Sequence, residues 1–223
     1  MQPYIILLMI LGFAGIAFWN WYDSKKRREL LGAWAVGKGW RFQPGKVSGP
    51  AAEYPGLKFF DRGHSRSACN IISGEHNGRS VRLMDYRYVT GSGKSRTTHH
   101  VGVLIMRTDF PTIPLTIRRE NPFDKVTEFF GADDIDFESA EFSRKFYVKS
   151  NDRKWAYDVI HQRTMDFLLA SPSYEIAFGM QEIAITKSRK LSPQGYDEAL
   201  ALATGFYDLV PDYVIRQMNG AAD

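Results

Sequence analysis

The segment from Gly91 to Ser95 reads GSGKS and is the part of the sequence that comes nearest to a nucleotide-binding motif. A phosphate-binding P-loop has the pattern G-x-x-x-x-G-K-[ST] and leads from a strand into a helix. The first glycine of that pattern would fall at position 88, where the chain has Tyr88, and the segment joins two strand-like runs. We therefore interpret it as a flexible hairpin loop, and its stretch from Gly91 to Arg96 is a candidate contact for a partner.

Histidine and cysteine residues do not show the spacing of a metal site or a catalytic motif. His99 and His100 are neighbours in an expected strand, so their side chains should point to opposite faces and cannot bind one metal together. Cys69 has no activating neighbour in the sequence, as is typical of a small buried residue. We predict no catalytic, cofactor-binding or metal-binding residue. The alternative is a hydrolase-like enzyme in which His64, His99 and Asp85 converge in one pocket.

The net charge of +4 comes from one short segment. Lys25, Lys26, Arg27 and Arg28 are consecutive, and the rest of the chain is neutral once these four are subtracted. A nucleic-acid partner would require a basic face on the folded part, so the charge balance disfavours one. The single cysteine, Cys69, excludes an internal disulfide.

An uncharged stretch of 20 residues precedes the basic cluster, from Pro3 to Tyr22. As a helix it would be about 30 Å long, which matches the hydrocarbon core of a bilayer. A cleaved signal peptide would carry a charged segment first, and a core helix would rarely be so uniformly apolar. We predict a transmembrane anchor over residues 1–22 in the inner (plasma) membrane. The basic residues follow the helix, so the positive-inside rule places the C-terminal domain in the cytoplasm.

Residues at the end of the anchor are expected to meet the membrane interface. Aromatic side chains are enriched at that level, and basic side chains attract anionic lipid headgroups. The predicted interface residues are Trp19, Trp21, Tyr22, Lys25, Lys26, Arg27 and Arg28. Residues 23–39 continue as a basic juxtamembrane helix, with the lipid bilayer as the expected partner.

Residues 40–218 are predicted to form one soluble α+β domain, followed by a short tail at residues 219–223. Asn77-Gly78 lies between two strand-like runs and favours a tight β-hairpin turn. Further strands are expected over residues 97–107, 115–118 and 142–149, and a strand pair over residues 174–178 and 182–186. Helices are expected over residues 123–130, 154–160 and 162–169 and from Ser192 onward. Because strands and helices do not alternate regularly, the fold class is an antiparallel β-meander with packed helices.

Three segments also resemble a bacterial family of single-pass membrane-anchored proteins with a soluble α+β domain and no known activity. They are GWRFQP at Gly39 to Pro44, the run from Asn70 to His99 that begins NIISGEHNG, and the run from Glu138 to Leu169 that begins ESAEFSRKF. The likeness covers most of the soluble domain. It implies the architecture and a bacterial source, and it implies no catalytic or cofactor residues. The function expected from the sequence is a membrane-tethered, non-catalytic module that binds a protein or the membrane surface.

Overall fold

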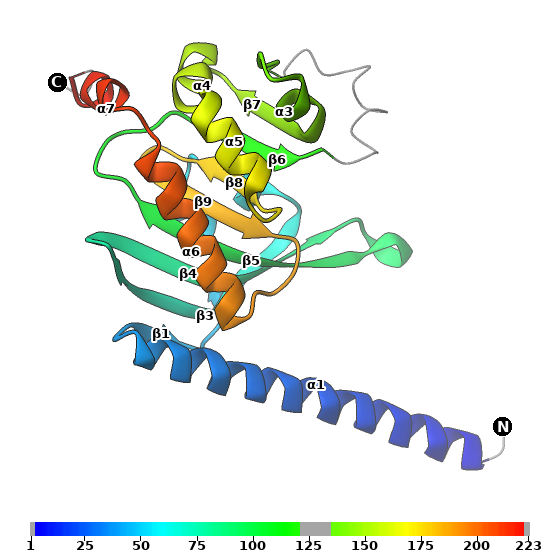
Figure 1. Ribbon diagram of the computed structural model, residues 1–223. Helices are drawn as coiled ribbons and strands as arrows, with labels where there is room; N and C mark the ends of the chain where they lie inside the picture. The colour runs from blue at the N-terminus through cyan, green and yellow to red at the C-terminus, as the bar shows by residue number, and fades with distance from the viewer. Residues whose placement is uncertain (1–2, 121–134, 221–223) are drawn as a thin grey trace.

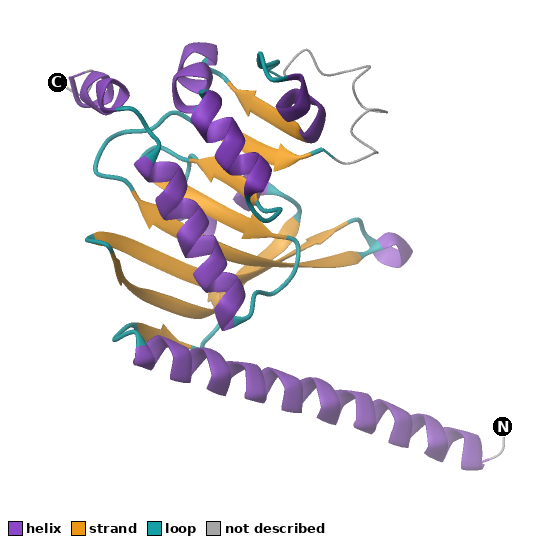
Figure 2. Cartoon of the chain, in the orientation of Figure 1, coloured by secondary structure: helices purple, strands orange, loops and turns teal. Residues whose placement is uncertain are grey.

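The computed structural model describes residues 3–120 and 135–220, with the backbone alone at residues 3–7, 50 and 51. In this part of the chain one large antiparallel sheet carries helices across one face (Figure 1; Figure 2). The predicted α+β class is confirmed. The helix predicted over residues 123–130 lies outside the described residues.

The sheet has nine strands in the order β1-β3-β4-β5-β9-β8-β6-β7, and β2 pairs with β3 outside this path. All of these pairings are antiparallel. The strands are β1 (Arg41–Gln43), β2 (Val47–Ser48), β3 (His64–His76), β4 (Arg79–Thr90), β5 (Thr97–Arg107), β6 (Leu115–Arg119), β7 (Phe146–Ser150), β8 (Glu175–Phe178) and β9 (Glu182–Lys187).

The predicted turn at Asn77-Gly78 joins β3 to β4. Both residues have positive φ, 49° and 75°, which is the conformation that a two-residue type I′ turn needs. The pairing runs from His76 opposite Arg79 back toward His64 opposite Val89, with two register shifts on the way. The β3-β4-β5 meander expected from the sequence is therefore present.

Helices cover one face of the sheet and a short irregular segment covers the other. The first face packs against α4 (Arg153–Val159), α5 (Gln162–Ala170) and α6 (Pro193–Asp208), and α7 (Asp212–Gly220) follows at the C-terminal end. On the second face, Phe59 and Phe60 of the 3-10 helix η2 (Lys58–Asp61) are buried against Tyr86 of β4. Two apolar clusters, one on each face, therefore stabilise the sheet.

The strand predicted over residues 142–149 was wrong in its first half. Residues Ala140–Lys145 form helix α3, and only Phe146–Ser150 forms the strand β7. The Oγ of Ser139 accepts a hydrogen bond from the Phe142 N–H at 3.3 Å, which caps the helix. Phe142 and Phe146, four residues apart, then stack with ring centroids 4.7 Å apart. The strand-like pattern of residues 142–149 did not reveal that Ser139 caps a short helix before the strand begins.

Helix α1 runs without interruption from Pro3 to Gly37, so the predicted anchor and juxtamembrane helix are one element. Only its C-terminal part packs on the domain, where Leu31 and Ala35 are fully buried in the main cluster. The N-terminal part extends away from the sheet (Figure 1).

In the part of the chain that the structure describes, no helix is long and apolar enough to cross a membrane. The stretch predicted to form the anchor begins at Pro3, whereas the first described side chain of α1 is that of Leu8. The transmembrane anchor over residues 1–22 stays a prediction.

The cap of α6 can be tested directly. The Oγ of Ser192 accepts a hydrogen bond from the Gly195 N–H at 3.1 Å, and Pro193 occupies the first turn. We expect Ser192→Ala to lower the free energy of unfolding by about 1 kcal/mol, because the N–H loses its partner. Urea unfolding of the detergent-solubilised chain measures this. Ser192→Thr keeps the acceptor and should stay close to wild type, and equal losses in both variants would contradict the capping role.

Candidate functional site

A β-bulge in β3 directs an amide side chain toward the neighbouring strand. The register between β3 and β4 shifts between Cys69 and Ile72, and Asn70 lies inside this shift with a φ of 50°. Asparagine tolerates the left-handed region better than most residues. The bulge places the Asn70 Nδ2 2.8 Å from the Oδ2 of Asp85, to which it donates a hydrogen bond.

Asp85 lies on the helix-covered face of β4, among apolar residues. Side chains alternate along a strand, so Asp85 shares its face with Val81 and Leu83, both buried in the main cluster. The side chain of Asp85 is 4% exposed. A carboxylate so deeply buried requires a cation or several hydrogen-bond donors.

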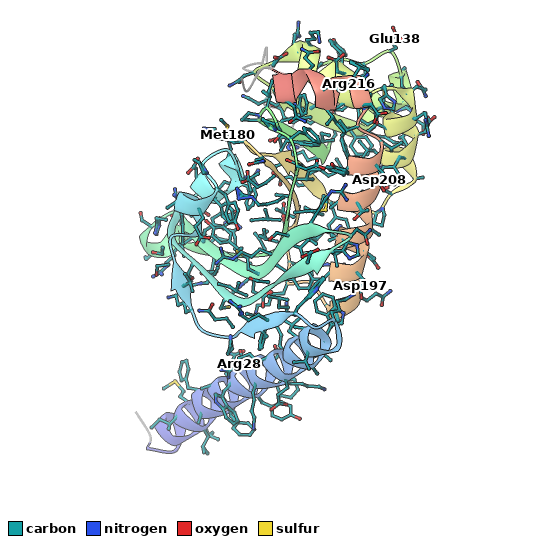
Figure 3. All side chains as sticks on the ribbon, turned by 90° about the vertical axis from the view of Figure 1, so that its left-hand side faces the viewer. Arg28, Glu138, Met180, Asp197, Asp208 and Arg216 are labelled. Atoms are coloured by element: carbon teal, nitrogen blue, oxygen red, sulfur yellow. The ribbon has the colours of Figure 1, made fainter. Side chains whose placement is uncertain are left out.

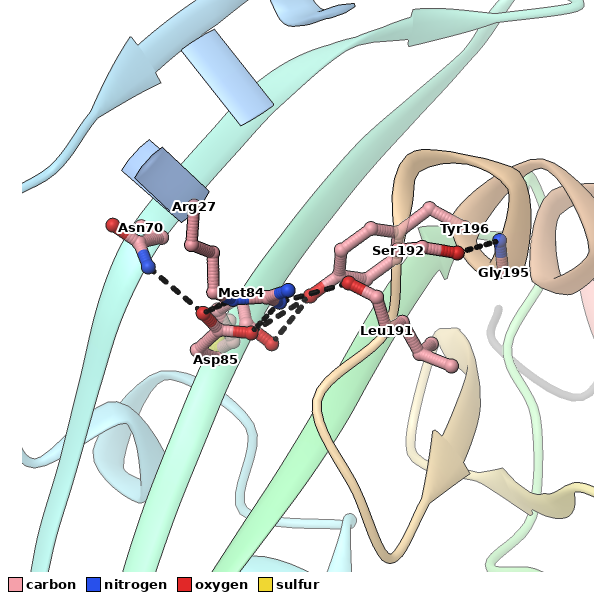
Figure 4. Close-up of polar contacts among 8 residues, drawn as sticks. All are labelled: Arg27, Asn70, Met84, Asp85, Leu191, Ser192, Gly195 and Tyr196. Carbon is pink, nitrogen blue, oxygen red and sulfur yellow. Dashed lines mark hydrogen bonds and ion pairs between the residues drawn. The ribbon is translucent and has the colours of Figure 1, made fainter. Parts of the chain in front are cut away.

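Arg27 of α1 supplies that cation. Its Nε donates to Oδ2 of Asp85 at 2.8 Å and its Nη2 donates to Oδ1 at 2.5 Å, which makes a two-pronged ion pair (Figure 4). The same Nη2 donates to the backbone carbonyl of Leu191 at 2.8 Å. Arg27 therefore joins α1 to β4 and to the loop before α6 at one point.

Tyr196 of α6 closes the polar cluster from the other side. Its hydroxyl donates to the Met84 carbonyl at 3.0 Å and lies 3.5 Å from Oδ1 of Asp85. Burial, followed by the charge of Asp85, raises the pKa of Tyr196 well above its ordinary value. Burial lowers the pKa of Arg27, but the hydrogen bond and charge of Asp85 outweigh it and leave the pKa raised. Tyr196 therefore remains a neutral phenol beside the ion pair at neutral pH.

Apolar contacts around the ion pair hold the rest of the α1 terminus. Trp34 stacks on Tyr196 with ring centroids 6.0 Å apart and meets the edge of Trp40 at 5.6 Å. The ring of Trp40 fills the space beside Gly74, where a Cβ would lie 2.2 Å from it. Lys38 forms an ion pair with Asp197 at 2.8 Å, and Figure 3 shows Asp197 on α6 beside the end of α1. Packing and charge together fix the angle at which the helix leaves the domain.

The three residues of the hydrolase alternative do not converge. Asp85 and His99 lie on opposite faces, because His99 pairs with Tyr88, three positions along β4 from Asp85. His99 accepts or donates a bond to the Thr90 hydroxyl at 2.7 Å and stacks on Tyr88. His64 contacts the hydroxyl of Ser65 and the Gly91 carbonyl. Asp85 is occupied by Arg27, so the arrangement offers no acid–base pair.

A hollow of about 440 Å³ opens at the far end of the sheet, lined in part by Pro114, Leu115 and Phe178. The basic side chains of Lys58, Arg62, Arg118 and Lys149 are also part of its lining. None of the residues of the hydrolase alternative lies there. Among the described residues, no group of three or more histidine, cysteine, aspartate or glutamate side chains is placed to hold a metal.

The predicted membrane-interface residues divide into two groups. Trp19, Trp21, Tyr22, Lys25, Lys26 and Arg28 are exposed on α1, and Figure 3 shows Arg28 beside the helix. Arg27, by contrast, points to the sheet with a side chain 15% exposed. Its charge is compensated by Asp85, so Arg27 should attract lipid headgroups less strongly than the exposed cations beside it.

Sequence reasoning missed Asn70, Tyr196 and the pairing of Arg27 with Asp85. One signal was available: Asp85 follows Val81 and Leu83 at alternate positions of a strand and so had to face the core. The identity of its partner could not be read from the sequence, because Arg27 is 58 residues away in a helix. The positive φ at Asn70 has no sequence signature beyond the residue type.

The ion pair should be a main determinant of how firmly α1 is attached. Asp85→Asn leaves the Arg27 guanidinium without its counter-charge. Loss of one partner of a buried pair costs about 3–5 kcal/mol, and we expect the lower end because Arg27 keeps some contact with solvent. Urea unfolding in detergent measures the loss.

Two further variants separate the pair from general effects. Arg27→Met with Asp85→Leu removes both charges and should recover much of the stability. Lys26→Met removes an exposed neighbouring charge and should change it by less than about 0.5 kcal/mol. A loss in Lys26→Met as large as that in Asp85→Asn would contradict the special role of the pair.

Comparisons with known proteins identify a fold and no family. No family model and no curated protein matches the chain. The resemblance to a bacterial family of membrane-anchored proteins therefore stays a prediction. Among solved structures, the crystal structure of the mycobacterial trehalose monomycolate transport factor A, TtfA, superimposes with a TM-score of 0.59. The match has 14% sequence identity and covers 83% of this chain and 93% of that one. At this identity the likeness shows a shared fold.

Proposed function

We propose that this protein is a membrane-tethered, non-catalytic module that binds a protein partner or the membrane surface. Helix α1 is the tether, and the sheet domain lies on the cytoplasmic side of the plasma membrane. A bacterial source and the lipid bilayer as a partner belong to the same proposal.

The exposed apolar half of α1 carries the proposal. Every described side chain from Leu8 to Lys26 is exposed, so none of them is buried against the domain. Large apolar residues are exposed on all sides of it, from Leu11 at 59% and Phe13 at 72% to Trp19 at 72%. A helix that is apolar all around is stable in apolar surroundings, which the domain does not provide and a bilayer does.

The sequence of the helix fits a membrane boundary near Tyr22. The uncharged stretch from Pro3 to Tyr22 ends in aromatic residues, and the first basic side chains follow at Lys25 and Lys26. This is the order expected for a transmembrane helix whose C-terminal end lies at the membrane surface.

The tether is a direct continuation of the domain. Because α1 stays helical to Gly37 and Arg27 is paired with Asp85, no flexible linker separates the exposed half from the sheet. The domain would therefore be held at the membrane in a fixed orientation and at a raised local concentration for a partner there. The shared fold with a protein named as a transport factor supports an accessory role of this kind, without indicating the partner.

Membrane integration can be tested by extracting cell membranes at alkaline pH. The wild-type chain should remain with the lipid pellet. Ile10→Lys combined with Phe13→Lys should release most of the protein, because a charged residue within the bilayer costs about 2.5–3.5 kcal/mol. Met180→Lys is the matched control, since Met180 is 57% exposed on the domain. Release of the wild type would overturn the tether.

Orientation can be tested by fusing a phosphatase or a fluorescent protein after Asp223. We expect fluorescence without phosphatase activity, because the basic residues that follow the helix favour the cytoplasmic side. The opposite pattern would place the domain outside the cell membrane.

A further inference from the structure

The end of the β4–β5 hairpin forms a basic arm. We define the basic arm as residues 87–100, which include the turn with the 3-10 helix η3 (Gly93–Ser95). It carries Arg87, Lys94 and Arg96, and residues 86–101 contain no aspartate or glutamate. Lys94 and Arg96 are exposed at the turn. The arm therefore presents positive charge without compensating carboxylates in its own sequence.

A second basic segment lies against the base of this arm. Residues 187–190 read KSRK, and the Arg189 carbonyl accepts a hydrogen bond from the Gly102 N–H at 2.8 Å. A hollow of about 450 Å³ lies between the two segments, lined by Tyr88, Thr98, His99, His100, Val101, Ser188, Arg189 and Lys190. Its titratable lining consists of bases and a phenol, so an anion would meet no carboxylate there.

The basic arm points to the same side of the molecule as the exposed half of α1. Figure 1 shows the turn between β4 and β5 projecting beyond the body of the domain toward the side on which α1 extends to its N-terminus. Lys25 and Lys26 are exposed on α1 immediately N-terminal to Arg27, at the start of the half that extends in this direction. The exposed half of α1 and the basic arm thus extend in the same direction.

We infer that the basic arm and the loop 187–190 bind anionic lipid headgroups and form a second contact of the domain with the membrane. This inference rests on the proposed tether, which brings the arm to the bilayer. A nucleic acid would also be attracted by positive charge, but the exposed apolar helix beside the arm favours a lipid surface.

The geometry sets a condition on the tether. Counted from the Arg27–Asp85 pair, β4 advances about 17 Å to Thr90 at roughly 3.3 Å per residue. Helix α1 advances only about 7.5 Å from Arg27 to Tyr22 at 1.5 Å per residue. The turn and Tyr22 can therefore meet the same membrane surface only if β4 lies at a larger angle to the membrane normal than α1, whose tilt in membranes is about 20° on average and up to about 40°.

The test uses the full chain in vesicles, with a fluorophore on Ser92→Cys in a Cys69→Ala background. Lipids that carry a nitroxide on the headgroup quench the fluorophore when the turn touches the membrane. We expect quenching in vesicles of phosphatidylcholine with phosphatidylglycerol, and little in phosphatidylcholine alone. Lys94→Gln with Arg96→Gln should lower the ratio of docked to undocked turn at least tenfold, since each cation near an anionic surface contributes about fivefold.

Arg153→Gln with Arg163→Gln is the matched control. It removes two exposed charges from α4 and α5 and should leave the quenching unchanged. Flotation of the same vesicles tests the tether separately. Flotation without quenching in anionic vesicles would overturn the inference and leave the tether standing. If the protein floats only with anionic vesicles and shows quenching there, the headgroup contact of the basic arm is supported and the tether is overturned.

A nucleic-acid role is an outcome of the same series. Salt-sensitive binding of a labelled DNA duplex that Lys94→Gln with Arg96→Gln abolishes, without quenching in anionic vesicles, would assign the basic arm to nucleic acid and overturn the lipid contact. Equal quenching in both kinds of vesicle, unchanged in the double variant, would indicate an apolar contact. That result would also overturn the proposed contact with anionic headgroups.

Discussion

The buried ion pair between Arg27 and Asp85 is the constraint around which the α1 end of the domain is built. A carboxylate 4% exposed on the core face of β4 is tolerated because three groups serve it: a guanidinium with two bonds, the amide of Asn70 and the nearby phenol of Tyr196. Each group comes from a different element, so α1, β3, β4 and α6 must all be in place at once. Apolar residues of similar size could hold the same elements more strongly, but without the directionality of a two-pronged pair.

The directionality of this ion pair explains why α1 leaves the domain at one defined angle. Trp34, Trp40 and Ala35 supply contact area, while the position of Arg27 sets the rotation of the helix about its axis. The residues N-terminal to the pair then extend with their apolar side chains exposed. A partner or a membrane bound to this half would therefore fix the orientation of the whole sheet. A domain on a flexible linker would not be oriented in this way.

Charge placement in the fold differs from the charge balance of the sequence. Outside residues 25–28 the chain is neutral, which disfavoured a basic surface. In the structure, several carboxylates are engaged by basic residues elsewhere, as in the pairs Arg62–Glu175, Arg82–Glu53 and Lys38–Asp197. The end of the β4–β5 hairpin and the loop 187–190 are left as a locally basic side. A neutral total therefore does not exclude a charged face, because partners are chosen by proximity in the fold.

The sequence by itself determined the elements whose signals are local. Asn77-Gly78 defined the hairpin, Ser192-Pro193 defined the start of α6, and the uncharged run from Pro3 to Tyr22 defined the apolar half of α1. It failed at residues 140–145, where a capping serine outweighed an alternating pattern. Only the tertiary structure decided the pairing of Arg27 with Asp85, the separation of His64, His99 and Asp85, and the direction of the basic arm. These depend on contacts between residues far apart in the chain, and the periodicity of one segment carries no information about which other segment it meets.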